Sequence, residues 1–223
     1  MTTTMERVRA VWTRAASFPA DKEAYYPEHA RAHDFDSFAE KRVLEYGCGG
    51  GSDTASLIRR GAYVFYADVV PSNVAATRAR VLASGSAHRA EGLVLERSAA
   101  IPLPDESVDA VTSHGVLHHI EEPLPVLAEF RRLLVPSGRL LVMFYTEHLR
   151  AHLAGQVAKF RALHPELSGD EAFGWATDGE GVPYARSYTE KEGRELFEAA
   201  GFDVVHTVLY NTKMFRTFWM KRA

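Results

Sequence analysis

Residues 43–51 read VLEYGCGGG, in which an apolar pair and Glu45 lead into glycines at alternate positions. Gly47, Gly49 and Gly51 have no Cβ atoms, so a ligand can approach the backbone closely. A helix that begins directly after such a turn also presents unpaired backbone N–H groups. The segment therefore predicts a ligand-binding turn between a strand and a helix.

Two classes of cofactor use a glycine turn of this kind. A dinucleotide site should read G-x-G-x-x-G, but the sixth position counted from Gly47 is Ser52, and the third glycine comes one place early at Gly51. The pattern E-x-G-x-G-x-G instead favours a ligand that packs an adenosine and an amino acid against the loop. Asp68 lies about 20 residues beyond the turn, where a carboxylate can bind a ribose diol in either class.

Several side chains near predicted strand ends could move a proton or hold a substrate. His114 ends one predicted strand and Tyr145 ends the next. The adjacent His118 and His119 could be a base, a metal pair or hydrogen-bonded structure. Cys48 is a thiol without an identifiable base, so we expect its backbone to face the ligand.

The elements that must position these residues alternate between strand and helix. The patterns predict an N-terminal helix over 5–17, ending near 18–19, with later helices at 52–60, 72–83, 124–134 and 190–200. Strands are predicted at 43–46, 63–67, 92–96, 108–113 and 139–145, followed by β-like runs at 204–209 and 214–220. Gly61 is a predicted C-cap and Ser72 a predicted N-cap. This alternation predicts a mostly parallel sheet with helices on both faces.

Residues 147–187 interrupt the alternation. A helical piece is expected first and then a turn-rich stretch, SGDEAFGWATDGEGVPYARS. We interpret the segment as an insertion that shapes a substrate pocket, because long connections in compact domains are usually functional or disordered. Arg186 in this insertion could pair with a substrate carboxylate or phosphate, or form a surface salt bridge.

Composition narrows the class of protein. The 223 residues, 46% of them hydrophobic, suit a single domain over 1–223. A formal charge of −3 from 26 basic and 29 acidic residues provides no basic field for nucleic acid or an anionic membrane. One cysteine excludes an internal disulfide and suits a reducing compartment. With no signal-peptide pattern and no apolar run near the ~20 residues of a membrane span, we expect a cytoplasmic protein.

Four blocks of sequence, in order between about Val43 and Leu209, resemble the class I S-adenosylmethionine-dependent methyltransferases, in particular the small-molecule group. The blocks are VLEYGCGGG, VFYADVVPSNV, IPLPDESVDAVTSHGVLHHI and EFRRLLVPSGRLLVMF. The resemblance implies an α/β, Rossmann-like, doubly wound sheet of seven strands, mostly parallel with an antiparallel last strand. It also implies that S-adenosylmethionine, and its product S-adenosylhomocysteine, bind across the carboxyl ends of the first, second and fourth strands.

The resemblance assigns roles to individual positions. The glycine loop would line the methionine portion of the cofactor, with Glu45 toward its amino group, Asp68 on both ribose hydroxyls and Val69 on the adenine. Ser98 and Ala99 match the segment that reads the adenine edge, whereas Arg97 stands where many relatives have an acidic acceptor and is left out, because it cannot accept a hydrogen bond. The full expected cofactor set is Tyr26, Glu45, Gly47, Cys48, Gly49, Asp68, Val69, Ser98, Ala99, His114 and His119. The expected catalytic residues are His114 and Tyr26, and the expected substrate residues are Tyr25, His118, Tyr145 and Arg186.

The function implied is transfer of a methyl group to an O, N or S nucleophile of a small polar metabolite, in a biosynthetic pathway, by a monomer or homodimer. Residues 1–40 would form a lid over the cofactor. A methyltransferase for RNA or protein, or a non-catalytic cofactor-binding protein, remains as an alternative. We expect no metal, because no H-x-x-x-H or cysteine pattern lies where a ligand set would be expected and transfer from a sulfonium needs no Lewis acid.

Overall fold

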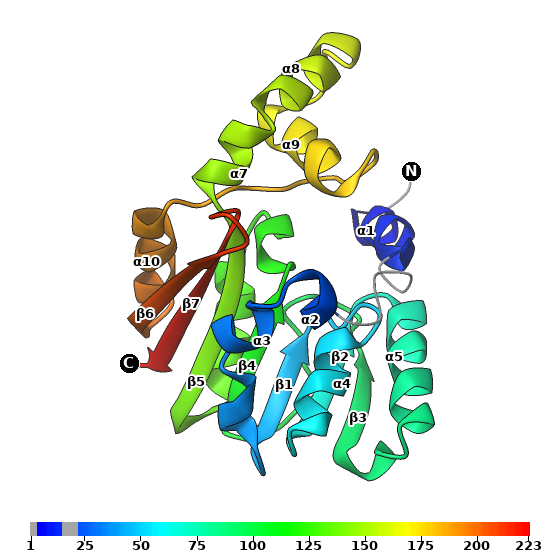
Figure 1. The fold of residues 1–223 in the computed structure, drawn as a ribbon, viewed down its shortest axis with the longest axis vertical. Helices are drawn as coiled ribbons and strands as arrows, with labels where there is room; N and C mark the ends of the chain where they lie inside the picture. The colour runs from blue at the N-terminus through cyan, green and yellow to red at the C-terminus, as the bar shows by residue number, and fades with distance from the viewer. Residues whose placement is uncertain (1–3, 15–21) are drawn as a thin grey trace.

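The computed structural model describes residues 4–14 and 22–223, and its central element is a seven-stranded sheet in the order β3-β2-β1-β4-β5-β7-β6 (Figure 1). The strands are β1 (Arg42–Tyr46), β2 (Tyr63–Asp68), β3 (Ala90–Val94), β4 (Val108–His114), β5 (Leu134–Tyr145), β6 (Phe202–Tyr210) and β7 (Phe215–Arg222). All neighbouring pairs are parallel except β5 with β7 and β6 with β7. Only β7 therefore runs against the others, which confirms the predicted sheet.

Alternating side chains divide the core into two layers. Val43 packs with α4 (Ser52–Arg59), α5 (Pro71–Ala83) and the short helix η2 (Phe35–Phe38). Its neighbour Leu44 points to the opposite layer, which includes α6 (Leu124–Leu133) and α10 (Glu190–Ala199). Because successive side chains of a strand face opposite sides, a central strand buried on both faces must be apolar at nearly every position. Among the four buried residues of β1, the exception is Glu45, which is almost fully buried.

Several element boundaries differ from the predictions. Helix α5 begins at Pro71 with Val70 as its N-cap, so the prediction for Ser72 was wrong. Proline suits the first helical position because its φ is fixed and its missing N–H would have no partner there. Strand β5 starts at Leu134, directly after α6, and therefore includes residues 135–138, which lie between the predicted helix 124–134 and the predicted strand 139–145. The N-terminal helix α1 spans Thr4–Trp12. Its predicted end, near residues 18–19, lies outside the described residues.

The insertion contains three helices, α7 (Glu147–His152), α8 (Ala154–Leu163) and α9 (Gly169–Asp178), where a helical piece and a turn-rich stretch were expected. Helix α9 begins with a capping box. The Ser168 side chain accepts a hydrogen bond from the backbone N–H of Glu171 (3.1 Å), and the Glu171 carboxylate accepts one from the backbone N–H of Ser168 (2.9 Å). Phe173 anchors the helix by complete burial. Reciprocal capping and one buried aromatic outweigh the glycines of this stretch.

The insertion and the N-terminal helices lie at the edge of the sheet where the parallel strands end. Figure 1 shows α7, α8 and α9 above this edge, with α1 on the same side of the molecule. The short helices α2 (Lys22–Tyr25) and α3 (His29–Ala32) run in front of β1 and β4. Among the described residues, no helix combines the length and the apolar character needed to cross a membrane.

Candidate functional site

The glycine loop turns sharply after β1 and lies against the end of β2. The backbone N–H groups of Gly47 and Cys48 both donate to the carbonyl of Ala67 (2.7 and 3.0 Å). Gly47 has φ +82°, and a Cβ there would lie 2.2 Å from a methyl group of Val116. The loop thus needs glycine at this position both for its conformation and for its contact with the segment after β4.

Asp68 ends β2 and organises the loop. One of its carboxylate oxygens accepts from the backbone N–H of Gly49 (3.0 Å) and from the side chain of Asn73 (3.2 Å). The other accepts from the backbone N–H of Val70 (2.9 Å). Burial raises the pKa of Asp68, and the surrounding N–H donors oppose that effect. Each carboxylate oxygen has further acceptor capacity, so both could also receive hydroxyl groups of a ligand.

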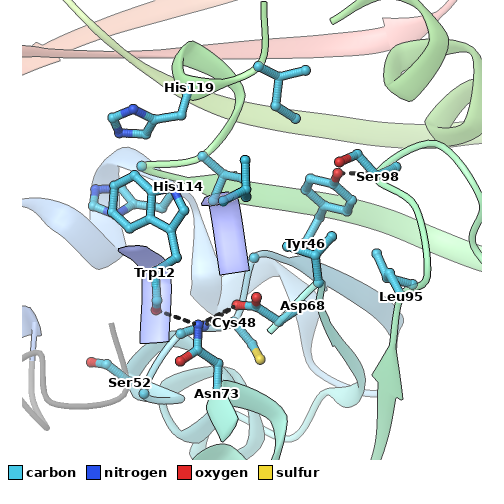
Figure 2. A pocket seen from close by; sticks show the side chains of 18 of the residues that line it. Trp12, Tyr46, Cys48, Ser52, Asp68, Asn73, Leu95, Ser98, His114 and His119 are labelled. Atoms are coloured by element: carbon cyan, nitrogen blue, oxygen red, sulfur yellow. Dashed lines mark hydrogen bonds between the residues drawn. The ribbon is translucent and has the colours of Figure 1, made fainter. Parts of the chain in front are cut away.

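A cavity opens between the glycine loop, the ends of β2 and β4, and α1 (Figure 2). Eight of the predicted residues line it, namely Gly47, Cys48, Gly49, Asp68, Val69, Ser98, His114 and His119. The remaining lining residues are Val8, Trp12, Lys22, Tyr46, Gly50, Ser52, Asn73, Leu95, Gly115, Val116 and Ile120. The cavity is therefore apolar around Val69 and Leu95, just beyond β2 and β3, and polar near Asp68, Lys22 and His114.

Helix α1 closes one side of this cavity. Its Arg9 donates hydrogen bonds to the carbonyls of Val69 (2.9 Å) and Leu95 (3.3 Å), just beyond β2 and β3. The carbonyl of Trp12 accepts from the Asn73 side chain (3.2 Å), as Figure 2 shows. The cavity is thus covered by α1 rather than by Tyr25 and Tyr26.

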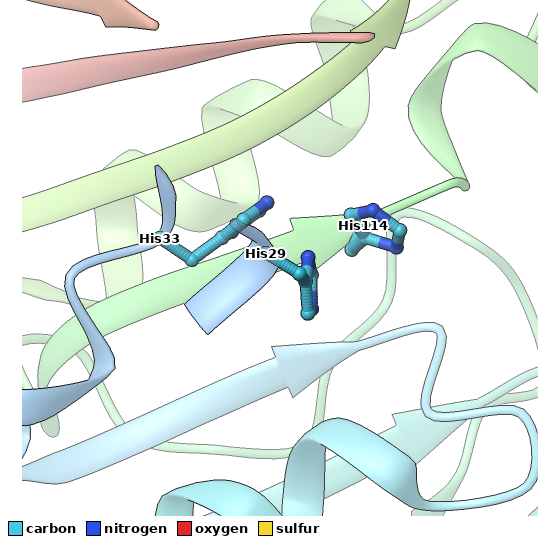
Figure 3. Close-up of side chains that lie close together, drawn as sticks. All are labelled: His29, His33 and His114. Carbon is cyan, nitrogen blue, oxygen red and sulfur yellow. The ribbon is translucent and has the colours of Figure 1, made fainter. Parts of the chain in front are cut away.

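Beside the polar end of the cavity, two fully buried histidines and one half-buried histidine lie close together (Figure 3). His29 and His33 belong to α3 and its C-cap, His114 ends β4, and one ring nitrogen from each lies within 4.8 Å of the others. Such a group could hold a metal ion, and the H-x-x-x-H spacing of His29 and His33 is a signal that the sequence interpretation discounted. That no metal is used stays a prediction.

Each of these rings already has polar partners. His29 Nε2 lies 2.9 Å from the Asp53 carboxylate, and the two nitrogens of His33 each lie 3.2 Å from a threonine hydroxyl. The Lys22 ammonium donates to Asp53 (2.8 Å) and to His114 Nδ1 (3.2 Å). Burial disfavours the charged form of Asp53, but Lys22 and His29 hold the pKa of this carboxyl well below its usual value. A fixed cation therefore occupies the polar end of the cavity.

Glu45 and Ala99 lie beneath the cavity rather than in its wall. The Glu45 carboxylate accepts a hydrogen bond from the Thr54 hydroxyl. Burial, together with the nearby Asp53 carboxylate, raises the pKa of Glu45 to about 8. Ala99 is partly buried against the layer that contains Leu44.

Tyr25, Tyr26 and Arg186 also lie outside the cavity wall. Tyr25 is 68% exposed, and Tyr26 packs edge-on against Phe215 with ring centroids 5.4 Å apart. Arg186 pairs with Glu192 (2.9 Å), so its charge is neutralised at the start of α10. Of the two interpretations that the sequence left open for Arg186, the structure shows the salt bridge.

The paired histidines and Tyr145 lie together under the insertion. The His118 ring is fully buried and stacks on Tyr145, with centroids 3.8 Å apart. The Tyr145 hydroxyl donates to the Asp178 carboxylate at the end of α9 (3.0 Å). His119 Nδ1 lies 2.8 Å from the carbonyl of Tyr184, and its Nε2 lies 3.5 Å from Asp178. Of this group, only His119 reaches the cavity.

The sequence interpretation missed Trp12, Lys22, Asn73 and Asp178. Asn73 could have been found, because it lies in the first turn of the helix that follows Asp68 and its side chain reaches the Asp68 carboxylate. Lys22 and Trp12 are placed by the docking of segments outside the repeating strand and helix pattern, for which the sequence offers no periodic signal. Asp178 was hidden because its helix was taken for a turn.

Comparisons with known proteins agree with this geometry. Residues 44–142 match the family model described as a methyltransferase domain. A ubiquinone biosynthesis O-methyltransferase of Aeromonas salmonicida is 32% identical over 113 residues, which are 51% of this chain and 47% of that protein.

Two solved structures share the fold. One is a SAM dependent methyltransferase from Aquifex aeolicus, with a TM-score of 0.66 and 20% identity, covering 91% of this chain and 93% of the other. The other is the 1,6-didemethyltoxoflavin-N1-methyltransferase of Burkholderia thailandensis, solved with 1,6-didemethyltoxoflavin and S-adenosylhomocysteine. It has a TM-score of 0.59 and 21% identity, covering 99% of this chain and 84% of the other.

Residues 44–142 therefore match a methyltransferase domain, and the whole chain shares the fold of these two solved methyltransferases. The chain spans about half the length of the curated relatives it matches.

Proposed function

We propose that this protein transfers a methyl group from S-adenosylmethionine to an O, N or S nucleophile of a small polar metabolite in a biosynthetic pathway. The observation that carries the proposal is the cavity formed by the glycine loop, Asp68 and the segment after β4. Two relatives support it: one is named for ubiquinone biosynthesis, and one was solved with a small acceptor and S-adenosylhomocysteine.

The lining of the cavity fits the chemical groups of this cofactor. Asp68 offers two carboxylate oxygens to the ribose hydroxyls, and the apolar surface of Val69 and Leu95 suits the adenine. The Lys22 ammonium, at the opposite end, would pair with the carboxylate of the methionine portion. These three features match a ribose diol, an aromatic base and an amino acid carboxylate.

When bound, the cofactor would supply an electrophilic methyl group on a positively charged sulfur. The chain would hold the acceptor in line with that group and keep water away from it. Positioning of this kind can lower a barrier by about 7–11 kcal/mol. Trp12 and Val8 on α1 cover the cavity and would keep water out of it.

The acceptor side favours a small molecule over a macromolecule. We propose that the N-terminal segment and the insertion form this side within one domain, with residues 1–40 as the lid. The net charge of −3 offers little attraction for RNA. A single buried cysteine is compatible with the reducing cytoplasm, where we propose that the protein works. We propose that it does so as a monomer or homodimer.

The direct test is incubation with methyl-labelled cofactor and fractionated metabolites, followed by identification of the labelled product. Label should appear in a small polar compound and not in RNA or protein from the same extract. Label confined to RNA or protein would replace the proposed acceptor class. Binding of the cofactor without any labelled product would favour the non-catalytic alternative.

A further inference from the structure

The hydrogen bonds of His119 fix which of its ring nitrogens carries hydrogen. Nδ1 lies 2.8 Å from the carbonyl oxygen of Tyr184, and a carbonyl can only accept. Nδ1 must therefore be the protonated nitrogen. In the neutral ring, Nε2 then carries a lone pair, and it makes no hydrogen bond with any described residue although it is buried.

Asp178 lies where it would stabilise a proton on that lone pair. Its carboxylate oxygen is 3.5 Å from His119 Nε2, and the Tyr145 hydroxyl donates to the same carboxylate at 3.0–3.3 Å. The Tyr145 contact fixes the orientation of Asp178 without neutralising its charge. An imidazolium at His119 would thus lie beside an oriented anion that stabilises its charge.

His114 does not offer a comparable lone pair. An ammonium can only donate, so the contact with Lys22 (3.2 Å) makes His114 Nδ1 the acceptor. The hydrogen of the neutral ring is then on Nε2, which lies 3.1 Å from the Tyr210 hydroxyl. Both nitrogens of His114 are engaged, and a neighbouring ammonium opposes its protonation.

We propose, resting on the methyl transfer proposed above, that His119 is the general base for the acceptor and that Asp178 is its positioning residue. His119 Nε2 takes the proton from the acceptor O–H or N–H, and the electron pair left on the acceptor forms the bond to the methyl carbon. The pair of the broken carbon–sulfur bond stays on sulfur. Asp178 stabilises the imidazolium, and the Tyr184 carbonyl keeps the ring in the required tautomer.

Burial keeps this base unprotonated near neutral pH. It lowers the pKa of His119, while Asp178 and the Tyr184 carbonyl act in the opposite direction. The titratable groups facing the ring are Asp178 from α9, Tyr145 from β5 and the neighbouring His118. The Trp12 ring covers His119 from α1, with centroids 4.6 Å apart, so α1 must move for the acceptor to enter.

The tautomer can be measured without a known acceptor, by ¹⁵N NMR of the histidine-labelled protein with S-adenosylhomocysteine bound. His119→Gln assigns the signals. The expected spectrum at pH 7.5 has a protonated Nδ1 and a bare Nε2 at His119, with a titration midpoint below that of an exposed histidine. Asp178→Asn should lower this midpoint further, because the carboxylate charge is lost while a partner for Tyr145 remains. A protonated Nε2 in the neutral ring would overturn the proposal.

Kinetics with the acceptor identified by methyl labelling provide the second readout. His119→Gln should reduce the rate by about 10²- to 10⁴-fold and abolish the rise of rate with pH, measured at saturating S-adenosylmethionine. His88→Gln, at an exposed histidine on η3 (Ala87–Arg89), is the matched control and should behave like the wild type. An unchanged pH profile in His119→Gln would overturn the base assignment. If the wild type did not bind S-adenosylhomocysteine at all, that result would instead count against the proposed function.

Discussion

Asp68 is the side chain on which the cofactor assignment depends most. Its carboxylate lines the cavity and is oriented by hydrogen bonds from Gly49, Val70 and Asn73. Hydrogen bonds to a charged group contribute about 1.5–3 kcal/mol, so Asp68→Ala should weaken S-adenosylhomocysteine binding roughly ten- to a hundredfold. Calorimetry measures this directly, with the exposed Asp203→Ala on β6 as control. Equal affinities for the two variants would remove Asp68 from the site.

Glu45 should make stability depend on pH. Burial and the Asp53 carboxylate raise its pKa from 4.5 to about 8. Because the folded pKa lies above the unfolded one, the contribution of Glu45 to the free energy of unfolding is fully present below about pH 4.5 and is lost as pH rises toward about 8.

Glu45→Gln, which cannot ionise, should remove that loss. Denaturant unfolding at pH 5 and pH 8 should show the variant gaining on the wild type at the higher pH, by on the order of 2–4 kcal/mol. The exposed Glu91→Gln on β3 serves as the control. Parallel stability curves for Glu45→Gln and the wild type would mean that Glu45 is ionised in the fold.

At the scale of elements, Arg9 ties α1 to the ends of β2 and β3 by hydrogen bonds. Arg9 donates to the carbonyls of Val69, Leu95 and Glu96. Arg9→Ala should loosen α1, speed hydrogen exchange of its amides and weaken S-adenosylhomocysteine binding about three- to tenfold, since each lost hydrogen bond costs about 0.5–1.5 kcal/mol. The exposed neighbour Arg7→Ala is the matched control. Normal exchange and affinity in Arg9→Ala would show that α1 does not act as a cover.

The repeating elements were predictable from sequence because apolar periodicity decides them. The strands on both sides of the glycine loop, and the placement of Gly47 and Asp68, follow from patterns within about 30 residues of chain. The insertion was less accessible, since α9 depends on the reciprocal cap of Ser168 and Glu171 and on the burial of Phe173. The general base proposed above could not be predicted from the sequence. His119 and Asp178 are distant in sequence, and only the fold shows which nitrogen is free.

For the whole molecule, charge argues against a nucleic-acid substrate. Binding to a phosphate backbone requires several basic side chains to neutralise it, and the chain has a formal charge of −3. Filter binding with total RNA at about 0.15 M salt should show no retention above background. The same assay at about 0.05 M salt tests for a weak electrostatic component. Retention that falls steeply with added salt would revive the macromolecular alternative.

The central claim is that the cavity is built for S-adenosylmethionine and not for a dinucleotide. Isothermal calorimetry of the purified chain with S-adenosylhomocysteine, and separately with NAD, tests it most directly. The glycine loop, the Asp68 carboxylate and the Lys22 ammonium predict one-to-one, micromolar binding of S-adenosylhomocysteine and no measurable binding of NAD. Tighter binding of NAD than of S-adenosylhomocysteine would contradict the account.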